Sequence, residues 1–176
     1  MSAAQIAHPD TQTDNAGNLF HPHSAIEGLW VADAEQRLDF LPTYFSSAFM
    51  NFESAIFNIA RTTFPGYSGG FWEYALTDSG LPLVYLAYRS TDDANARQTV
   101  SNMFQDEFQE LQPVLAGVIT TMVAAIAMIQ SADKLDLSDS EEQWFYNLHI
   151  NLRDYGLELG KKLGNEQDHT FFKLVD

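Results

Sequence analysis

The apolar stretch PVLAGVITTMVAAIAMI, residues 113–129, decides how the rest of this 176-residue chain is interpreted. No charged residue occurs between Glu110 and Asp133. About 17 mostly apolar residues lie between Gln112 and Gln130, which is near the lower limit for a membrane-spanning helix. Acidic residues flank the stretch, and no cluster of Lys or Arg sets an orientation in a bilayer. We therefore predict a buried core helix and no association with a membrane.

Short strands are predicted on the N-terminal side of this helix. Residues 71–76 are rich in aromatic side chains, residues 77–80 (TDSG) form a turn cluster, and residues 83–88 resume the strand pattern, so the three segments predict an antiparallel hairpin. Residues 98–103 and 104–109 are weaker strand candidates. Their possible inward-facing side chains are Val100, Met103, Phe104 and Phe108.

An amphipathic helix is predicted before the hairpin, over residues 42–63. Pro42 suits a first turn, and Pro65 with Gly66 would end the helix. Glu53 is expected at the boundary of the apolar face. Apolar side chains recur at steps of three and four at Tyr44, Phe45, Ala48, Phe49, Phe52, Ile56, Ile59 and Ala60.

A long helix is predicted after an acidic connector at residues 131–140. Ser138 and Glu141 have the spacing of a capping box, which places the helix start at about Ser138, and Gly164 suits its C-terminal cap. One face of this helix carries Trp144, Leu148, Leu152, Tyr155, Leu159 and Leu163. A terminal segment, residues 169–175, offers Phe171, Phe172 and Leu174 for packing onto the body.

Strands and helices are therefore segregated along the chain, which indicates an α+β fold. We predict a small antiparallel sheet of three to four strands. It would pack with an N-terminal amphipathic helix and two or more C-terminal helices. Residues 1–28 are polar and without a sustained period, so they are expected to form a flexible leader, and residues 29–176 a single domain.

The composition excludes several classes of function. Cysteine is absent, which excludes disulfides, thiolate metal sites and cysteine nucleophiles. The 24 acidic residues exceed the 9 basic ones, giving a formal net charge of −15, so the chain lacks the cationic footprint of direct nucleic-acid binding. The N-terminal residues show no basic start followed by an apolar run, which favours a cytoplasmic protein.

One motif resembles a catalytic one. Gly66–Gly70, GYSGG, matches the G-x-S-x-G nucleophile elbow, but the elbow needs a strand entering and a helix leaving. Here a predicted helix enters and a predicted strand leaves, so a glycine-rich structural loop is favoured. A small serine hydrolase using Ser68 stays as an alternative. His21 and His23 are expected in a loop. We predict no catalytic residue, cofactor or metal site.

The acidic connector is the candidate partner surface. It carries Asp133, Asp136, Asp139, Glu141 and Glu142 but lacks the glycine and the ligand spacing of a calcium loop. A solvated connector followed by an acidic helix start is therefore favoured over a calcium site.

Several strings of the sequence resemble one known family. Tyr67-Ser68-Gly69-Gly70-Phe71-Trp72 is the centre, and Tyr74 and Leu76 follow it. Further matching positions are Arg37-Leu38, Phe40, Pro42, Phe45, Met50, Glu53, Leu152 to Tyr155 and Phe172 to Asp176, and the apolar helix from Ala116 matches in character. Over about residues 29–176 the chain resembles the ArdB/KlcA antirestriction family. It departs at residues 78–80 and 85–87, where that family usually has an Asn-Gly-Gly turn and an aromatic-Met-Ala-Pro stretch.

The resemblance implies a non-enzymatic protein of a plasmid, phage or other mobile genetic element. Such proteins protect incoming DNA against type I restriction-modification in the host cytoplasm. The implied partner is a protein of the host restriction pathway, either the type I restriction-modification complex or an associated factor. The motif residues Tyr67, Ser68, Gly69, Gly70 and Trp72 would be either folding determinants or an interface, and folding is favoured.

An acidic antirestriction protein could also act as a DNA mimic, and the charge density bears on this alternative. A compact domain of this length is about 40 Å wide, and duplex DNA carries on the order of 24 phosphates over that width. The chain has 24 carboxylates in total. Residues 92–142 hold ten of them against two bases, whereas residues 143–176 hold five against four. One face would hold only a fraction of the required density, so a faithful DNA mimic is not favoured.

Overall fold

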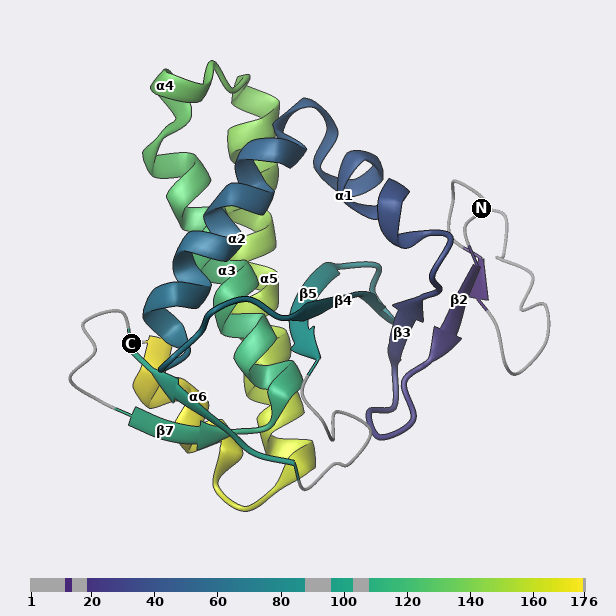
Figure 1. The fold of residues 1–176 in the computed structure, drawn as a ribbon, viewed down its shortest axis with the longest axis vertical. Coiled ribbons are helices and arrows are strands. Elements are labelled where there is room, and N and C mark those ends of the chain that lie inside the picture. Colours follow the sequence, from purple (N-terminus) through teal and green to yellow (C-terminus); the bar gives the residue numbers. More distant parts are fainter. Residues whose placement is uncertain (1–11, 14–18, 88–95, 103–107, 176) are drawn as a thin grey trace.

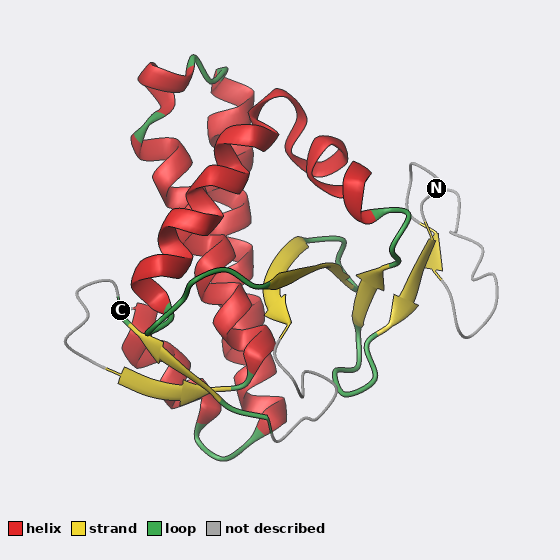
Figure 2. Cartoon of the chain, viewed as in Figure 1, coloured by secondary structure: helices red, strands yellow, loops and turns green. Residues whose placement is uncertain are grey.

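The computed structural model describes residues 12–13, 19–87, 96–102 and 108–175. Figure 1 shows a bundle of long helices beside an antiparallel sheet, with a separate two-stranded ribbon at one end of the bundle. In Figure 2, which is coloured by secondary structure, the long helices lie together and the strands of the main sheet lie together beside them. The predicted α+β class is confirmed. The predicted packing of an antiparallel sheet with an N-terminal helical segment and several C-terminal helices is confirmed as well.

The predicted core helix is α3, Pro113–Gln130, and 72% of its residues are buried inside the fold. Pro113 occupies its first turn, where no backbone donor is required. The side chain of Gln112 caps it by accepting hydrogen bonds from the backbone N–H groups of Val114 (2.6 Å) and Leu115 (3.4 Å). The helix is long and apolar enough to cross a membrane by length and composition, but it contacts α2, α5 and β5. It therefore has the surroundings of a core helix.

The predicted hairpin is present as β4, Phe71–Thr77, and β5, Pro82–Ala87. The two strands pair in antiparallel register from Phe71 opposite Ala87 to Leu76 opposite Pro82. The turn between them begins at Thr77, whose hydroxyl accepts a hydrogen bond from the backbone N–H of Leu81 (3.1 Å).

The described residues extend this sheet further than the sequence predicted. Strands β1, Gln12–Thr13, β2, Leu19–Pro22, and β3, Leu29–Ala32, join β4 and β5 in one antiparallel sheet with the order β1-β2-β3-β4-β5. Phe20 and Ile26 are buried in the core. The body of the domain therefore begins before residue 29, and residues 19–28 of the expected leader belong to it. None of these three strands has more than four residues, which is too short to show a period, and β2 also contains Pro22.

The two weaker strand candidates form a separate ribbon rather than part of the main sheet. Strands β6, Gln98–Ser101, and β7, Phe108–Leu111, pair only with each other within the described residues. Val100 is buried as expected, but Phe108 is 53% exposed, and Met103 and Phe104 lie outside the described residues. The hydroxyl of Ser101 donates to the carbonyl of Thr62 (2.6 Å) and so ties the ribbon to the end of α2.

The amphipathic helix predicted over residues 42–63 is broken in two. Helix α1 spans Arg37–Phe45, a 3₁₀ turn spans Ser46–Ala48, and α2 spans Phe49–Thr63. The apolar period continues through the break and therefore conceals it. Ser46 interrupts the α-helix, because its φ of 47° lies in the left-handed region.

Two details of this helical segment test the prediction further. Pro42 lies inside α1 and not in a first turn, because the helix begins five residues earlier than expected. Glu53 is half-buried at the edge of the apolar face, as predicted.

The C-terminal helices follow the prediction closely. After the short helix α4, Ala132–Leu135, the capping box of Ser138 and Glu141 starts α5, Asp139–Leu163, which ends at Gly164. The terminal segment is helix α6, Gln167–Val175. Its Phe171 and Leu174 are buried against the body, whereas Phe172 is 39% exposed and does not pack as expected.

The contact between α3 and β5 joins the helical bundle to the sheet. β5 is an edge strand within the described sheet, and its Val84 directs both backbone groups toward α3. The hydroxyl of Thr121 accepts from Val84 N–H (3.1 Å) and lies 3.0 Å from Val84 O. Gly117, one turn earlier, allows the close approach, because an added Cβ would lie 2.1 Å from Cβ of Tyr85 and 2.9 Å from Val84 O.

This contact predicts that Thr121→Val lowers the free energy of unfolding by about 2 kcal/mol, because a buried backbone N–H loses its acceptor. Thr120→Val is the matched control. Thr120 is equally buried, but within the described part of the chain its hydroxyl bonds only to Ala116 O, which keeps its helical backbone partner. Urea unfolding of both variants measures the difference. Equal losses would show that the bond to β5 contributes no more than an ordinary bond within a helix.

Candidate functional site

The motif residues lie in and beside the loop that joins α2 to β4. Trp72, the second residue of β4, is 7% exposed, and its indole N–H donates to the hydroxyl of Tyr67 (3.0 Å). The rings of Phe57 and Phe64 pack around it at centroid distances of 6.2 and 6.4 Å. Gly69 has a φ of 118°, which side-chain-bearing residues rarely adopt. Tyr67, Gly69 and Trp72 therefore fix the path of the loop.

Ser68 is an exposed residue of this loop. A helix enters the loop and a strand leaves it, the reverse of the order in a nucleophile elbow. Clefts of about 520 and 530 Å³ lie beside Ser68. Among the described residues that line these two clefts none is a histidine, so neither cleft supplies Ser68 with an imidazole base.

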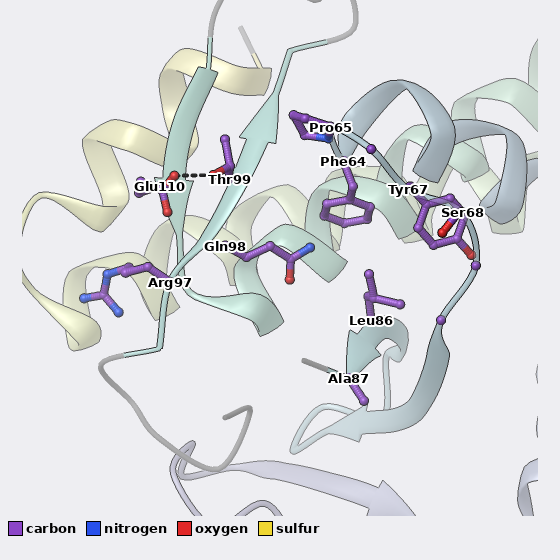
Figure 3. A pocket seen from close by; sticks show the side chains of 13 residues that line it. Phe64, Pro65, Tyr67, Ser68, Leu86, Ala87, Arg97, Gln98, Thr99 and Glu110 are labelled. Atoms are coloured by element: carbon purple, nitrogen blue, oxygen red, sulfur yellow. Dashed lines mark hydrogen bonds between the residues drawn. The ribbon is translucent and has the colours of Figure 1, made fainter. Parts of the chain in front are cut away.

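The cleft of about 520 Å³ separates the motif loop from the β6–β7 ribbon (Figure 3). Gln98 and Leu86 point into it from β6 and β5, and Thr99 is hydrogen-bonded to Glu110 across the ribbon. Gln98 is only 7% exposed, and its Oε1 has no hydrogen-bond partner among the described residues. The cleft therefore has a polar wall on the ribbon side and an apolar wall on the sheet side.

Other residues that carry the family resemblance meet where α1 crosses β4. Arg37 forms an ion pair with Glu73, and its guanidinium carbon lies 4.2 Å from the ring centroid of Phe71. The ring of Phe40 lies 5.2 Å from that of Tyr74. Burial raises the pKa of Tyr74, and the negative charge of Glu53 raises it further. These residues fix α1 against the sheet.

The five acidic residues of the candidate partner surface lie at the other end of α2. They occupy α4, the turn after it and the first turn of α5, at the top of Figure 1. The carboxylate of Glu141 accepts from Ser47 Oγ (2.7 Å), in the 3₁₀ turn that precedes α2. The motif loop follows the last residue of α2, about 22 Å away along its axis. The structure therefore does not bring the two candidate surfaces together.

Exposure differs among these five residues. Asp133, Asp136 and Asp139 are exposed, and Glu141 and Glu142 are partly buried. The backbone N–H of Ser138 and the hydroxyls of Ser47 and Ser138 hold the pKa of the Glu141 carboxyl below its ordinary value. Glu141 is therefore a fixed negative charge that joins the start of α5 to the α1–α2 junction.

An aromatic pocket beside this surface was not predicted from the sequence. It has a volume of about 230 Å³ and lies between the end of α1 and the first two turns of α5. Phe45 and Trp144 were expected on the apolar faces of two helices, but nothing in either helical period indicates that they meet. The lining residues are Tyr44, Phe45, Ser46, Ser140, Glu141, Trp144 and Phe145.

The loop expected for the two histidines is present for His23 but not for His21, which is exposed on strand β2. His23 is 8% exposed, and its Nδ1 accepts from the backbone N–H groups of Ala25 (3.0 Å) and Ile26 (3.1 Å). Within the described part of the chain, no three His, Asp or Glu side chains are grouped closely enough to hold a metal ion.

Comparison with known proteins finds a structural counterpart for most of the chain. One solved structure, of the KlcA and ArdB proteins, covers 84% of this chain and 94% of its own, with a TM-score of 0.63 and 21% sequence identity. The chain has the KlcA/ArdB fold. The resemblance expected from the sequence is thus confirmed at the level of the fold. No protein-family model and no curated protein sequence matches the chain.

The solved proteins are described as showing a novel fold and antirestriction activity against type I DNA restriction systems in vivo but not in vitro. In this chain the motif that carried the KlcA/ArdB resemblance is a packed loop at one end of α2. The acidic surface and the aromatic pocket are at the other end.

The packing of the loop predicts different effects for two neighbouring residues. Tyr67→Phe should lower the free energy of unfolding by about 1 kcal/mol, because the nearly buried indole N–H of Trp72 loses its acceptor. Ser68→Ala, at an exposed position of the loop, should change it by less than about 0.5 kcal/mol. Chemical unfolding of both variants is the measurement. A larger loss for Ser68→Ala would contradict this account of the loop.

The hydrogen bonds of Glu141 predict a pH-dependent contribution to stability. The folded-state pKa is lowered, so the contribution is present above the ordinary glutamate pKa of about 4.3 and is lost as the pH falls through the folded value. The stability difference between the wild type and Glu141→Gln should therefore shrink on acidification. Thermal unfolding from pH 7 to pH 3 measures it. A difference that is constant with pH would contradict the prediction.

Proposed function

We propose that this protein is a non-enzymatic antirestriction protein. It protects incoming mobile-element DNA from type I restriction-modification in the host cytoplasm, by contact with a protein of the restriction pathway. The observation that carries the proposal is the KlcA/ArdB fold over 84% of the chain. In this structure the motif on which the resemblance rests is packed, with the indole N–H of Trp72 donating to the hydroxyl of Tyr67.

The surroundings of Ser68 favour contact over catalysis. Its loop follows a helix and precedes a strand, and the described walls of the adjoining clefts offer it no histidine. Attack by a serine hydroxyl needs a base within hydrogen-bond reach and donors for the oxyanion. The exposed residues of the loop, Ser68 to Gly70, form a surface that another protein can contact.

The distribution of charge favours a local protein contact over DNA mimicry. The acidic residues of the connector lie together at one end of the bundle, whereas residues 143–176, which form most of α5 and α6, are nearly neutral. The solved KlcA and ArdB proteins are active in vivo but not in vitro. An inhibitor that occupied the DNA groove of the enzyme would be expected to act on purified components as well.

Plating unmodified phage on a host with a type I restriction system tests the proposal. Expression of this protein should raise the efficiency of plating toward that on a host without restriction, and Ser68→Ala should protect as well as the wild type. Phage that already carries the host modification is the control and should plate equally with and without the protein. An unchanged efficiency for unmodified phage would refute the function.

Two further outcomes identify the alternatives. Loss of protection in a folded Ser68→Ala variant would favour a serine hydrolase. Inhibition of a purified type I enzyme that competes with DNA and collapses as salt rises would favour a DNA mimic, because such binding depends on charge.

A further inference from the structure

The aromatic pocket at the α1–α2 junction has the geometry of a receptor for a single side chain. The rings of Phe45 and Phe145 are 3% and 1% exposed and close it on the inner side. Trp144 is half-buried and meets Phe45 edge-on, with ring centroids 5.1 Å apart. The volume of the pocket, about 230 Å³, is below the range of about 300–1,000 Å³ typical of small-molecule sites. One extended side chain fits that volume better than a cofactor or substrate.

The residues that line the pocket also favour an occupant with a positive charge. Aromatic faces attract cations, and Trp attracts them most strongly. Glu141 adds a carboxylate at the rim, held in place by Ser47 and Ser138. Among the lining residues, all of which are described, none is Lys or Arg. The pocket thus combines π faces with a fixed negative charge and has no cation of its own.

The electrostatic surroundings reinforce this preference. The start of α5 contributes the positive end of a helix dipole, equivalent to about half a unit charge. Asp139, Glu141 and Glu142 in the same turn contribute three full negative charges, and Asp133 and Asp136 lie just before it. Lys134 is the one basic residue between residues 131 and 146. The acidic side chains therefore outweigh the dipole, and the net field at the pocket attracts a cation.

We propose that this pocket binds the guanidinium side chain of an arginine in a basic segment of a protein partner. The planar guanidinium stacks against Trp144, and one of its N–H groups donates to Oε1 of Glu141. Among the described residues, this Oε1 accepts one other hydrogen bond, from Ser47, whereas Oε2 already accepts two from Ser138. The acidic residues of the connector lie beside the pocket and face the rest of the basic segment. The site goes beyond the proposed function, since any partner with an exposed arginine fits it.

A titration with a single-arginine probe tests the site directly. The probe is acetyl-Gly-Arg-Gly-amide, and acetyl-Gly-citrulline-Gly-amide is its neutral counterpart. The indole N–H resonance of Trp144, assigned by its loss in Trp144→Phe, is followed at 0.15 M salt. Saturable shifts with the arginine peptide, and binding of the citrulline peptide weaker by at least about fivefold, are the expected result.

Matched variants locate the binding. Glu141→Gln keeps the capping box, since glutamine serves in that position, and should weaken binding about fivefold. Glu142→Gln removes the same charge from a residue that does not line the pocket, and should have little effect. Trp144→Leu should abolish binding, whereas Tyr146→Leu removes an exposed ring outside the pocket and should not.

Three outcomes would overturn the proposal. These are no saturable shift with the arginine peptide, equal affinity for the citrulline peptide, and equal weakening by Glu141→Gln and Glu142→Gln. If Trp144→Leu does not fold, the comparison of the two peptides and of the two glutamate variants still decides. The phage-plating assay measures protection and not cation binding, so failure of this site leaves the proposed function standing.

Discussion

The contact between α3 and the edge strand β5 is the constraint on which the rest of the structure depends. An edge strand presents unpaired backbone groups, and in this fold an apolar helix covers them. Thr121 supplies the polar partner that Val84 needs, and Gly117 lets the helix backbone approach closely enough for the bond to form. Because α3 also contacts α2 and α5, this interface holds the sheet against the bundle, together with the contact of α1 with β4. It thereby sets where β4 begins and where the motif loop must run.

The motif loop and the aromatic pocket lie at opposite ends of α2, and different interactions form them. At its C-terminal end, a hydrogen bond between two aromatic side chains, Tyr67 and Trp72, stabilises the motif loop. At its N-terminal end, the aromatic pocket lies beside the break at Ser46, and Trp144 and Glu141 of α5 line it. The loop is a feature of the fold, because its packing sets the connection from helix to sheet. The aromatic pocket rests on two core rings, Phe45 and Phe145, but its outer side chains Trp144 and Glu141 are only partly buried. Such partly exposed positions can change in a chain that shares only 21% identity with its structural counterpart, without altering the architecture.

How much of this was predictable from sequence depended on whether the signal was local. The capping box of Ser138 and Glu141 and the hairpin between β4 and β5 were predicted correctly, because residues a few positions apart specify each. The pairing of β2 with β3 was missed, since strands of four residues show no period and gain their stability from the sheet they join. The break at Ser46 was missed because the apolar residues keep a helical spacing across it. The aromatic pocket could not be predicted, since Phe45 and Trp144 are about a hundred residues apart and each appeared to be an ordinary core position.

The scale of the acidic surface also bears on what it can recognise. Five carboxylates lie within the ten residues 133–142, in α4, the turn after it and the first turn of α5. For comparison, one continuous helix of ten residues would span about 15 Å, or about one charge per 3 Å. Duplex DNA carries one charge per ~1.7 Å, and 15 Å corresponds to fewer than five base pairs. The surface is therefore both sparser and much shorter than the duplex that a groove-binding enzyme encloses. It matches the length of a short basic segment, and the aromatic pocket beside it adds what DNA lacks, a concave site for one cationic side chain. In the proposed site, the carboxylates of the connector and the pocket carry the recognition, and the net charge of −15 is the background around that site.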